Sequence, residues 1–248
     1  MSAEAGPDAS GLRARAAQVL GRIAEAARRA GRDPREVTLV AVSKTHPAAL
    51  VREAVAAGLR DFGENRVQEA EGKIAELKAD LPDARWHLIG HLQPNKARRA
   101  ARLFDLIHTV DSAALVQRLE RICAEDARDS LDVLVQVDLA GEETKSGVTE
   151  KELPEVFEAL KDCGRVRCRG LMTLPPFFDD AERVRPYFRR LRELRDEWRG
   201  RGAFGVAGGG GAGELSMGMS HDFEVAVEEG ATLVRVGTSV FGERGGKV

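Results

Sequence analysis

The sequence is poor in cysteine, in aromatic residues and in net charge. Its 248 residues include three cysteines, Cys123, Cys163 and Cys168, with no CxxC spacing and no histidine pair that would complete a zinc site. Unclustered thiols are typical of a protein in a reducing compartment, so we expect a cytoplasmic location. The net charge of −2, from 38 basic and 40 acidic residues, gives no global attraction to nucleic acid or to a membrane surface.

Long hydrophobic runs are also absent. No stretch approaches about 18 uninterrupted apolar residues, and the first ten residues, MSAEAGPDAS, lack the apolar centre of a signal peptide. We therefore expect no membrane-spanning segment and a flexible tail over residues 1–10. Hydrophobic residues nevertheless make up 43% of the chain and charged residues 31%, which is the balance of a globular protein with a sizeable core.

Short apolar or β-branched runs alternate along the chain with longer helical patterns. Eight runs predict strands, at residues 37–44, 61–65, 85–90, 106–111, 131–140, 168–174, 214–218 and 232–237. Helical patterns occupy, among others, residues 11–30, 48–58, 112–127 and 184–198. Eight strand–helix units predict an α/β fold, a single (β/α)8 TIM-type barrel domain over 1–248 with an extra N-terminal helix. The alternative is an open doubly wound sheet, which the missing GxGxxG after the first strand disfavours.

Two segments resemble nucleotide or nucleic-acid sites only superficially. AGGGGAG, residues 207–213, lacks the GK[ST] ending of a P-loop, so we expect a flexible loop. KARRAAR, residues 96–102, has no interleaved aromatic residues, and we interpret it as a solvated helix face.

Histidines and aspartates at the strand ends invite other hypotheses. His87 and His91 have the spacing of helical zinc ligands, but the glutamate of HExxH is missing, and packing is the favoured interpretation. Asp111 and Asp138 end two strands, where they could act as bases or cap the following loops.

A lysine ends the first apolar strand, in LVAVSKTHP (39–47). Active sites of such barrels lie at the C-terminal ends of the strands, and alternation groups Lys44 with Val40 and Val42. Desolvation by these neighbours favours the neutral amine, which is a nucleophile toward aldehydes. The alternative is a lysine that extends into solvent.

A second cation approaches the same place from the last strand. In TLVRVGTSVFG, alternation puts Leu233, Arg235 and Gly237 on one face, and barrel closure makes this strand the neighbour of the first. Two cations close together favour an anionic or electron-rich ligand between them. An ion pair of Arg235 with an acidic residue is the alternative.

The loops after the seventh and eighth strands predict a phosphate site. Gly237 and Thr238 open a short helical segment, Ser220 is placed to cap the helix after the seventh strand, and Gly218 allows a close backbone approach. These loops commonly bind phosphate in barrels of this type. A lysine, an inward arginine and a phosphate cradle together specify an aldehyde that carries a phosphate, and pyridoxal 5′-phosphate (PLP) meets that description.

A family resemblance supports the same ligand. AVSKTHP, FGENRVQEA, WHLIGHLQPNK, IHTVD, KSGV, RGLMTL, LSMGMSHD and VRVGTSVFG resemble, in order and across essentially the full chain, the pyridoxal phosphate homeostasis protein family. The resemblance implies a barrel similar to the N-terminal domain of bacterial alanine racemase, with PLP on a lysine Schiff base and no robust catalysis.

The resemblance also implies roles for individual residues. Lys44 would form the Schiff base, Arg235 would contact the pyridine nitrogen and Asn65 would face the ring. The phosphate would be bound by Ser216 or Ser220 together with Gly237 and Thr238. Lys145 and Met172 are secondary candidates, Lys145 as a second lysine near the mouth. Many members carry a lysine two residues after the Schiff-base lysine, whereas this chain has His46, which puts any role of that lysine in question here.

The residues favour storage of PLP over catalysis. An arginine at the pyridine nitrogen keeps it unprotonated, which weakens the ring as an electron sink. Racemisation needs acid and base groups on opposite faces of the substrate, but the one tyrosine, Tyr187, lies in a helical pattern, and the residues after the last strand are too few for another domain. We expect a monomer that stores and buffers PLP and could deliver it to apoenzymes. The alternatives are a weak PLP-dependent racemase or lyase and a cofactor-free Schiff-base aldolase.

Overall fold

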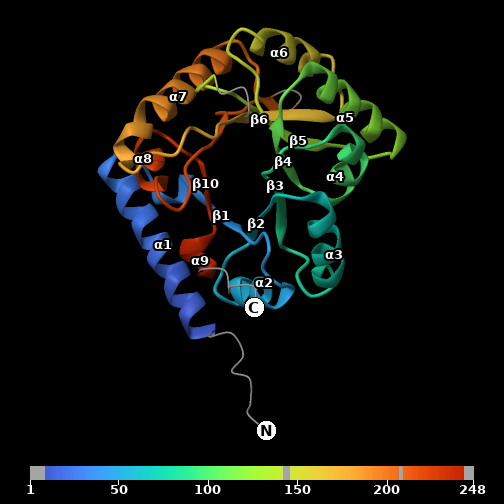
Figure 1. The fold of residues 1–248 in the computed structure, drawn as a ribbon. Helices are drawn as coiled ribbons and strands as arrows, with labels where there is room; N and C mark the ends of the chain where they lie inside the picture. Colours follow the sequence, from blue (N-terminus) through green and yellow to red (C-terminus); the bar gives the residue numbers. More distant parts are fainter. Residues whose placement is uncertain (1–8, 142–145, 207–208, 243–248) are drawn as a thin grey trace.

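Eight parallel strands close into a barrel in the computed structural model, which describes residues 9–141, 146–206 and 209–242 (Figure 1). The strands are β1 (Thr38–Val42), β2 (Asp61–Glu64), β3 (Arg85–Leu88), β4 (Leu106–Val110), β5 (Leu131–Gln136), β6 (Val166–Met172), β9 (Glu214–Ser216) and β10 (Leu233–Val236). All eight predicted strands are present. Because β1 pairs with both β2 and β10, the sheet has no edge, and the open-sheet alternative is wrong.

Helices form a ring outside the barrel (Figure 1). They are α1 (Ala9–Arg29), α2 (Ala48–Ala56), α3 (Val67–Leu77), α4 (Ala97–Leu103), α5 (Ala113–Glu125), α6 (Leu153–Lys161), α7 (Arg185–Gly200), α8 (Phe223–Glu228) and α9 (Thr238–Phe241). The extra N-terminal helix is α1, which packs against α8 and α9. It begins at Ala9, two residues inside the segment expected to be a tail.

One short sheet was missed in the sequence. Residues 205–206 (β7) and 209–210 (β8) pair antiparallel outside the barrel, so part of the glycine-rich segment forms a small hairpin arm. Two-residue strands of glycine and valine carry no alternation that could reveal them.

The barrel separates two apolar cores. The larger one lies between strands and helices, and the smaller one, inside the barrel, contains Val40, Leu134, Met172 and Leu233. Alternation along each strand explains the division, because successive side chains point to opposite faces. The inward positions of β1 and β10 can therefore be assigned from Val40 and Leu233.

The predicted solvated helix face forms α4. Arg98 and Arg102 of this helix make ion pairs with Asp126, after α5, so they join neighbouring helices.

The three cysteines are unpaired, and burial raises the pKa of the Cys168 thiol to about 12, which keeps it a thiol. In the described segments, no helix combines the length and the apolar character needed to cross a bilayer.

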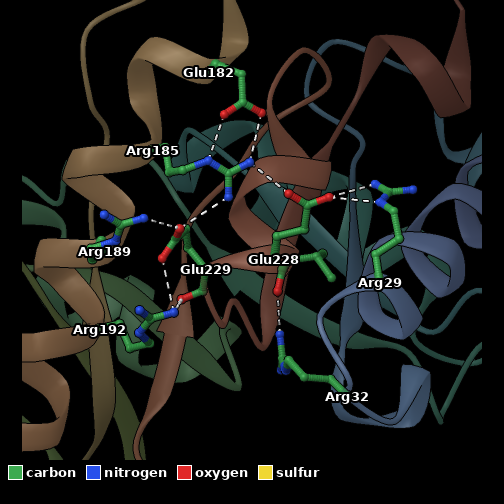
Figure 2. A network of polar contacts seen from close by, with 9 residues as sticks. Arg29, Arg32, Glu182, Arg185, Arg189, Arg192, Glu228 and Glu229 are labelled. Carbon is green, nitrogen blue, oxygen red and sulfur yellow. Dashed lines mark hydrogen bonds and ion pairs between the residues drawn. The ribbon is translucent and has the colours of Figure 1, made fainter.

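Ion pairs join α7, α8 and α1 on the outside of the barrel (Figure 2). The Glu229 side chain, 6% exposed, is surrounded by guanidinium groups of α7. Its carboxylate lies 3.0 to 3.2 Å from Arg185, Arg189 and Arg192. Glu228 pairs with Arg185 at 2.7 Å and with Arg29 of α1 at 2.8 Å. Burial alone would raise the pKa of Glu229, but the hydrogen bonds from Arg189 and Arg185 outweigh it and lower the pKa.

We expect Glu229→Gln to lower the free energy of unfolding by about 2 kcal/mol, because three arginines lose a charged acceptor. Since the pKa of Glu229 is lowered on folding, this stabilisation is present above about pH 4.3, the ordinary pKa of glutamate, and is lost as the pH falls through the folded value. Urea unfolding at neutral and acidic pH measures both effects. The control is Glu182→Gln, whose 61% exposed carboxylate also pairs with Arg185 and which we expect to cost no more than about 0.5 kcal/mol. Equal losses would contradict the prediction.

Candidate functional site

Lys44 lies just beyond the C-terminal end of β1, in a turn. Val40 of the same strand belongs to the core inside the barrel, so alternation puts Val42, the last residue of β1, on the inward side. Ser43 has its hydroxyl on Glu64, the last residue of β2, to whose carboxylate it donates at 2.7 Å. Lys44 itself is half-buried.

Side chains near α3 fix the backbone on both sides of Lys44. Lys73, 8% exposed, donates to the Ser43 carbonyl at 2.7 Å and to the Glu64 carboxylate at 2.6 Å. The Thr45 N–H donates to the Glu69 carboxylate, and Thr45 has a φ of 65°, which is costly for a β-branched residue. The turn after β1 is thus held in a conformation that it would not adopt alone. Lys73, Glu64 and Glu69 were not predicted from the sequence.

Arg235 is 3% exposed and points into the barrel from β10. Its guanidinium donates to the Ser216 hydroxyl at 2.7 Å and to the Thr173 carbonyl at 3.0 Å. Burial lowers its pKa to about 10, against the opposing charge of Asp222. In the part of the chain that the structure describes, Arg235 makes no ion pair, so the alternative of an acidic partner is not supported.

The loop after β10 lies against the end of β1. Val40 pairs in register with Arg235, and a Cβ added to Gly237 would lie 3.4 Å from both the Cβ and the carbonyl oxygen of Val42. Gly237 precedes α9, and Thr238, its first residue, is exposed. The adjoining loop is close too, since the ring of His46 stacks on Phe241 at 5.0 Å between centroids. The expected meeting of the two strand ends is therefore observed.

The two candidate serines occupy different environments. Ser216 is fully buried, and its hydroxyl contacts Arg235 and, at 2.8 Å, His108 Nδ1, so its geometry does not favour the phosphate role. Ser220 lies half-buried in the loop before α8. It does not cap that helix as predicted; Asp222 is the N-cap residue, and its carboxylate accepts from the Met219 N–H at 2.6 Å.

Close packing shapes the remaining loops. Gly218 has a φ of 90°, and a Cβ there would lie 2.5 Å from the Cβ of Ala226, which confirms the predicted close approach. A Cβ at Gly90 would lie 2.2 Å from the Asn65 carbonyl oxygen, so the loops after β2 and β3 are in contact and half-buried Asn65 stands at the mouth. Met172 is fully buried in the core inside the barrel. Lys145 lies outside the described residues.

The histidines and aspartates at the strand ends, which were considered as metal ligands or bases, have structural roles. His87 is buried within the barrel, whereas His91 pairs with Asp111 at 3.2 Å, so the two histidines have separate partners. Among described residues, no group of three or more potential ligands could hold a metal. Asp138 accepts from the N–H groups of Ala140 and Gly141, which confirms the loop-capping interpretation.

The barrel architecture corresponds to a known class, the family described as alanine racemase, N-terminal domain, whose model matches residues 17–245. Pyridoxal phosphate homeostasis proteins of Pseudomonas aeruginosa and Aquifex aeolicus are 50% and 47% identical over 230 residues each, covering 92% and 93% of this chain and 94% and 97% of theirs. The chain therefore belongs to the pyridoxal phosphate homeostasis protein family.

Solved structures agree with this assignment. PipY of Synechococcus elongatus with PLP bound has a TM-score of 0.79 and 44% identity, covering 93% of this chain and all of that one. Alanine racemase of Corynebacterium glutamicum has a TM-score of 0.66 at 20% identity, covering 96% of this chain but 62% of that one, which shows a shared barrel fold.

Proposed function

We propose that this protein binds pyridoxal 5′-phosphate at the C-terminal mouth of the barrel, through a Schiff base with Lys44, and serves in PLP homeostasis. The observation that carries the proposal is Arg235, a guanidinium buried without a carboxylate partner among the described residues, on the strand beside that of Lys44. A buried cation of this kind favours an electron-rich partner. The PLP-bound structure of PipY, at 44% identity, supports the same ligand.

The residues at the mouth fit the chemical groups of this cofactor. PLP supplies an aldehyde for covalent attachment and a conjugated ring that absorbs visible light. Lys44 would hold the aldehyde carbon and Arg235 the pyridine nitrogen, while Asn65 would border the ring. Ser220, Gly237 and Thr238 would hold the phosphate, with the Gly237–Val42 contact keeping that loop against β1. Met172 would form part of the apolar floor.

Storage of the cofactor fits these residues better than catalysis. Arg235 would keep the pyridine nitrogen unprotonated and the ring a weak electron sink. The single tyrosine, Tyr187, stacks on Phe178 at 6.1 Å in the outer layer, on α7, where it serves packing. The curated relatives are named for homeostasis. We therefore propose storage and buffering of PLP, with delivery to apoenzymes, by a cytoplasmic monomer.

The test is a visible spectrum of the purified protein before and after addition of PLP, followed by borohydride reduction and peptide mass mapping. We expect a yellow protein that carries a pyridoxyl group on the peptide containing Lys44, because borohydride reduces the carbon–nitrogen double bond of a Schiff base. A colourless protein without the adduct would refute PLP binding at this residue. If a racemisation assay on the yellow protein shows turnover comparable to dedicated racemases, the proposal of storage without catalysis is refuted.

A further inference from the structure

A continuous line of buried polar side chains runs from Arg235 across the barrel interior. The Ser216 hydroxyl accepts from Arg235 at 2.7 Å and lies 2.8 Å from His108 Nδ1. His108 Nε2 lies 2.9 Å from His87 Nδ1, and His87 Nε2 lies 2.9 Å from the Asp61 carboxylate. None of the five residues is more than 6% exposed. We call these residues the interior chain.

The interior chain is contributed by five different strands. Its members alternate along those strands with residues of the outer core, Phe62, Trp86, Ile107, Leu215 and Val234, so all five point inward. Asp61 is the first residue of β2, and its carboxylate lies 2.8 Å from Arg85, which is 60% exposed. The chain thus begins beside solvent-exposed Arg85 and ends at the proposed cofactor site.

When both imidazoles are neutral, the two ends of the interior chain determine the direction of its hydrogen bonds. A guanidinium can only donate, and an ionised carboxylate can only accept. With neutral imidazoles, Arg235 donates to Ser216, Ser216 to His108 Nδ1, His108 Nε2–H to His87 Nδ1, and His87 Nε2–H to Asp61. Burial, together with the charge of Arg235, lowers the pKa of His108 well below its ordinary value, in agreement with a neutral ring. Each ring nitrogen of His87 and His108 then has one hydrogen-bond partner and is either a donor or an acceptor.

We propose that the interior chain positions Arg235 and couples it to the charge of Asp61, so that Asp61 adjusts the electron demand at the pyridine nitrogen of bound PLP. This inference rests on the proposed function. Asp61, His87, His108 and Ser216 are positioning residues, since they reach the cofactor only through Arg235. Hydrogen bonds in such a buried series polarise one another, which carries the influence of a charge beyond its direct contacts. The other charged groups near its ends are Arg85 and Asp222.

The first test uses nitrogen-15 NMR of the imidazole rings in the full-length protein without PLP. We expect His87 and His108 to be neutral and protonated at Nε2. Asp61→Asn should change the ring-nitrogen resonances of His108, which Asp61 does not contact, while Lys161→Ala, at an exposed position on α6, should leave them unchanged. An imidazolium at either position, protonation at Nδ1, or a response confined to His87 would overturn the inference.

The second test measures the visible spectrum of the PLP-loaded protein against pH. Loss of one negative charge weakens the hydrogen bonds along the chain and disfavours protonation of the cofactor, so we expect Asp61→Asn to move the pH midpoint of the spectral change downward by about 0.5 to 1 unit. Ser216→Ala interrupts the same chain, and the double variant should shift no further than the larger single shift. Lys161→Ala, at an exposed position on α6, is the control, with an unchanged midpoint.

The two tests distinguish failure of the coupling from failure of PLP binding. Additive shifts, or a midpoint in Asp61→Asn equal to that of the unaltered protein, would overturn the coupling even if PLP binds. Absence of a visible band in the unaltered protein, together with the expected tautomers, would refute the proposed function and support the geometry of the interior chain.

Discussion

Replacement of Lys44 by alanine is expected to abolish covalent retention of PLP. The visible band should disappear, no pyridoxyl peptide should form on reduction, and affinity should fall about 100-fold or more, equal to about 2.8 kcal/mol. The physical reason is that the amine predicted to bond to the aldehyde is lost, while contacts to the ring and the phosphate remain. Equilibrium dialysis with PLP and the spectrum of the dialysed protein measure the two quantities.

The matched control for Lys44→Ala is Lys161→Ala. Lys161 ends α6 and pairs with Glu158 on the outside of the molecule, with 62% of its side chain exposed. We expect this variant to keep the band, the adduct and the affinity. Retention of a reducible adduct at another lysine in Lys44→Ala would show that the mouth offers a second amine, and equal behaviour of the two variants would remove Lys44 from the site.

The alternation of strands explains why the barrel and the meeting of its first and last strands could be predicted. Period-2 patterns assign each side chain to one of two faces, and the closure of eight strands makes the first and last neighbours. Lys44 and Arg235 needed only these two rules. The inward position of Arg235 follows from Leu233, which the structure places in the core inside the barrel, and the inward position of Lys44 stays a prediction.

The interior chain and the support of Lys44 could not be predicted in the same way. Alternation gives the face of Ser216 but not its height in the barrel, which depends on the stagger between strands. The contact of His87 with His108 joins two strands and depends on that register and on rotamers. Ser220 was misassigned as a cap because Asp222, two residues later, is an equally good cap by residue type.

Glu64 and Lys73 did leave a signal in the sequence. A glutamate at the end of the buried run DFGE and a lysine nine residues later, on the apolar face of a helix, are both improbable inside a protein unless they pair. Lys73 Nζ does lie 2.6 Å from Glu64 Oε1, with side-chain exposures of 6% and 0%. Burial of this pair costs free energy, but the same ammonium also holds the turn at Lys44, because it binds the Ser43 carbonyl.

We expect Lys73→Met to lower the free energy of unfolding by about 3 to 5 kcal/mol, since it leaves the Glu64 carboxylate buried and unpaired. Burial already raises the pKa of Glu64 against the opposing bonds from Lys73 and Ser43, and loss of Lys73 raises it further. A raised pKa means that the protonated carboxyl is compatible with folding below about pH 4.3, and that stability is lost as the pH rises through the folded value. The deficit of the variant should therefore be small near pH 4 and much larger at neutral pH, as measured by urea unfolding.

The double variant Glu64→Gln with Lys73→Met separates a buried charge from lost packing. It should recover more than half of the deficit at neutral pH, because the uncompensated carboxylate is gone. Lys78→Met, an exposed position directly after the same helix, should stay within about 0.5 kcal/mol of the unaltered protein. A deficit independent of pH, or no recovery in the double variant, would mean that Lys73 stabilises the turn at Lys44 through its bond to the Ser43 carbonyl and not through neutralisation of Glu64.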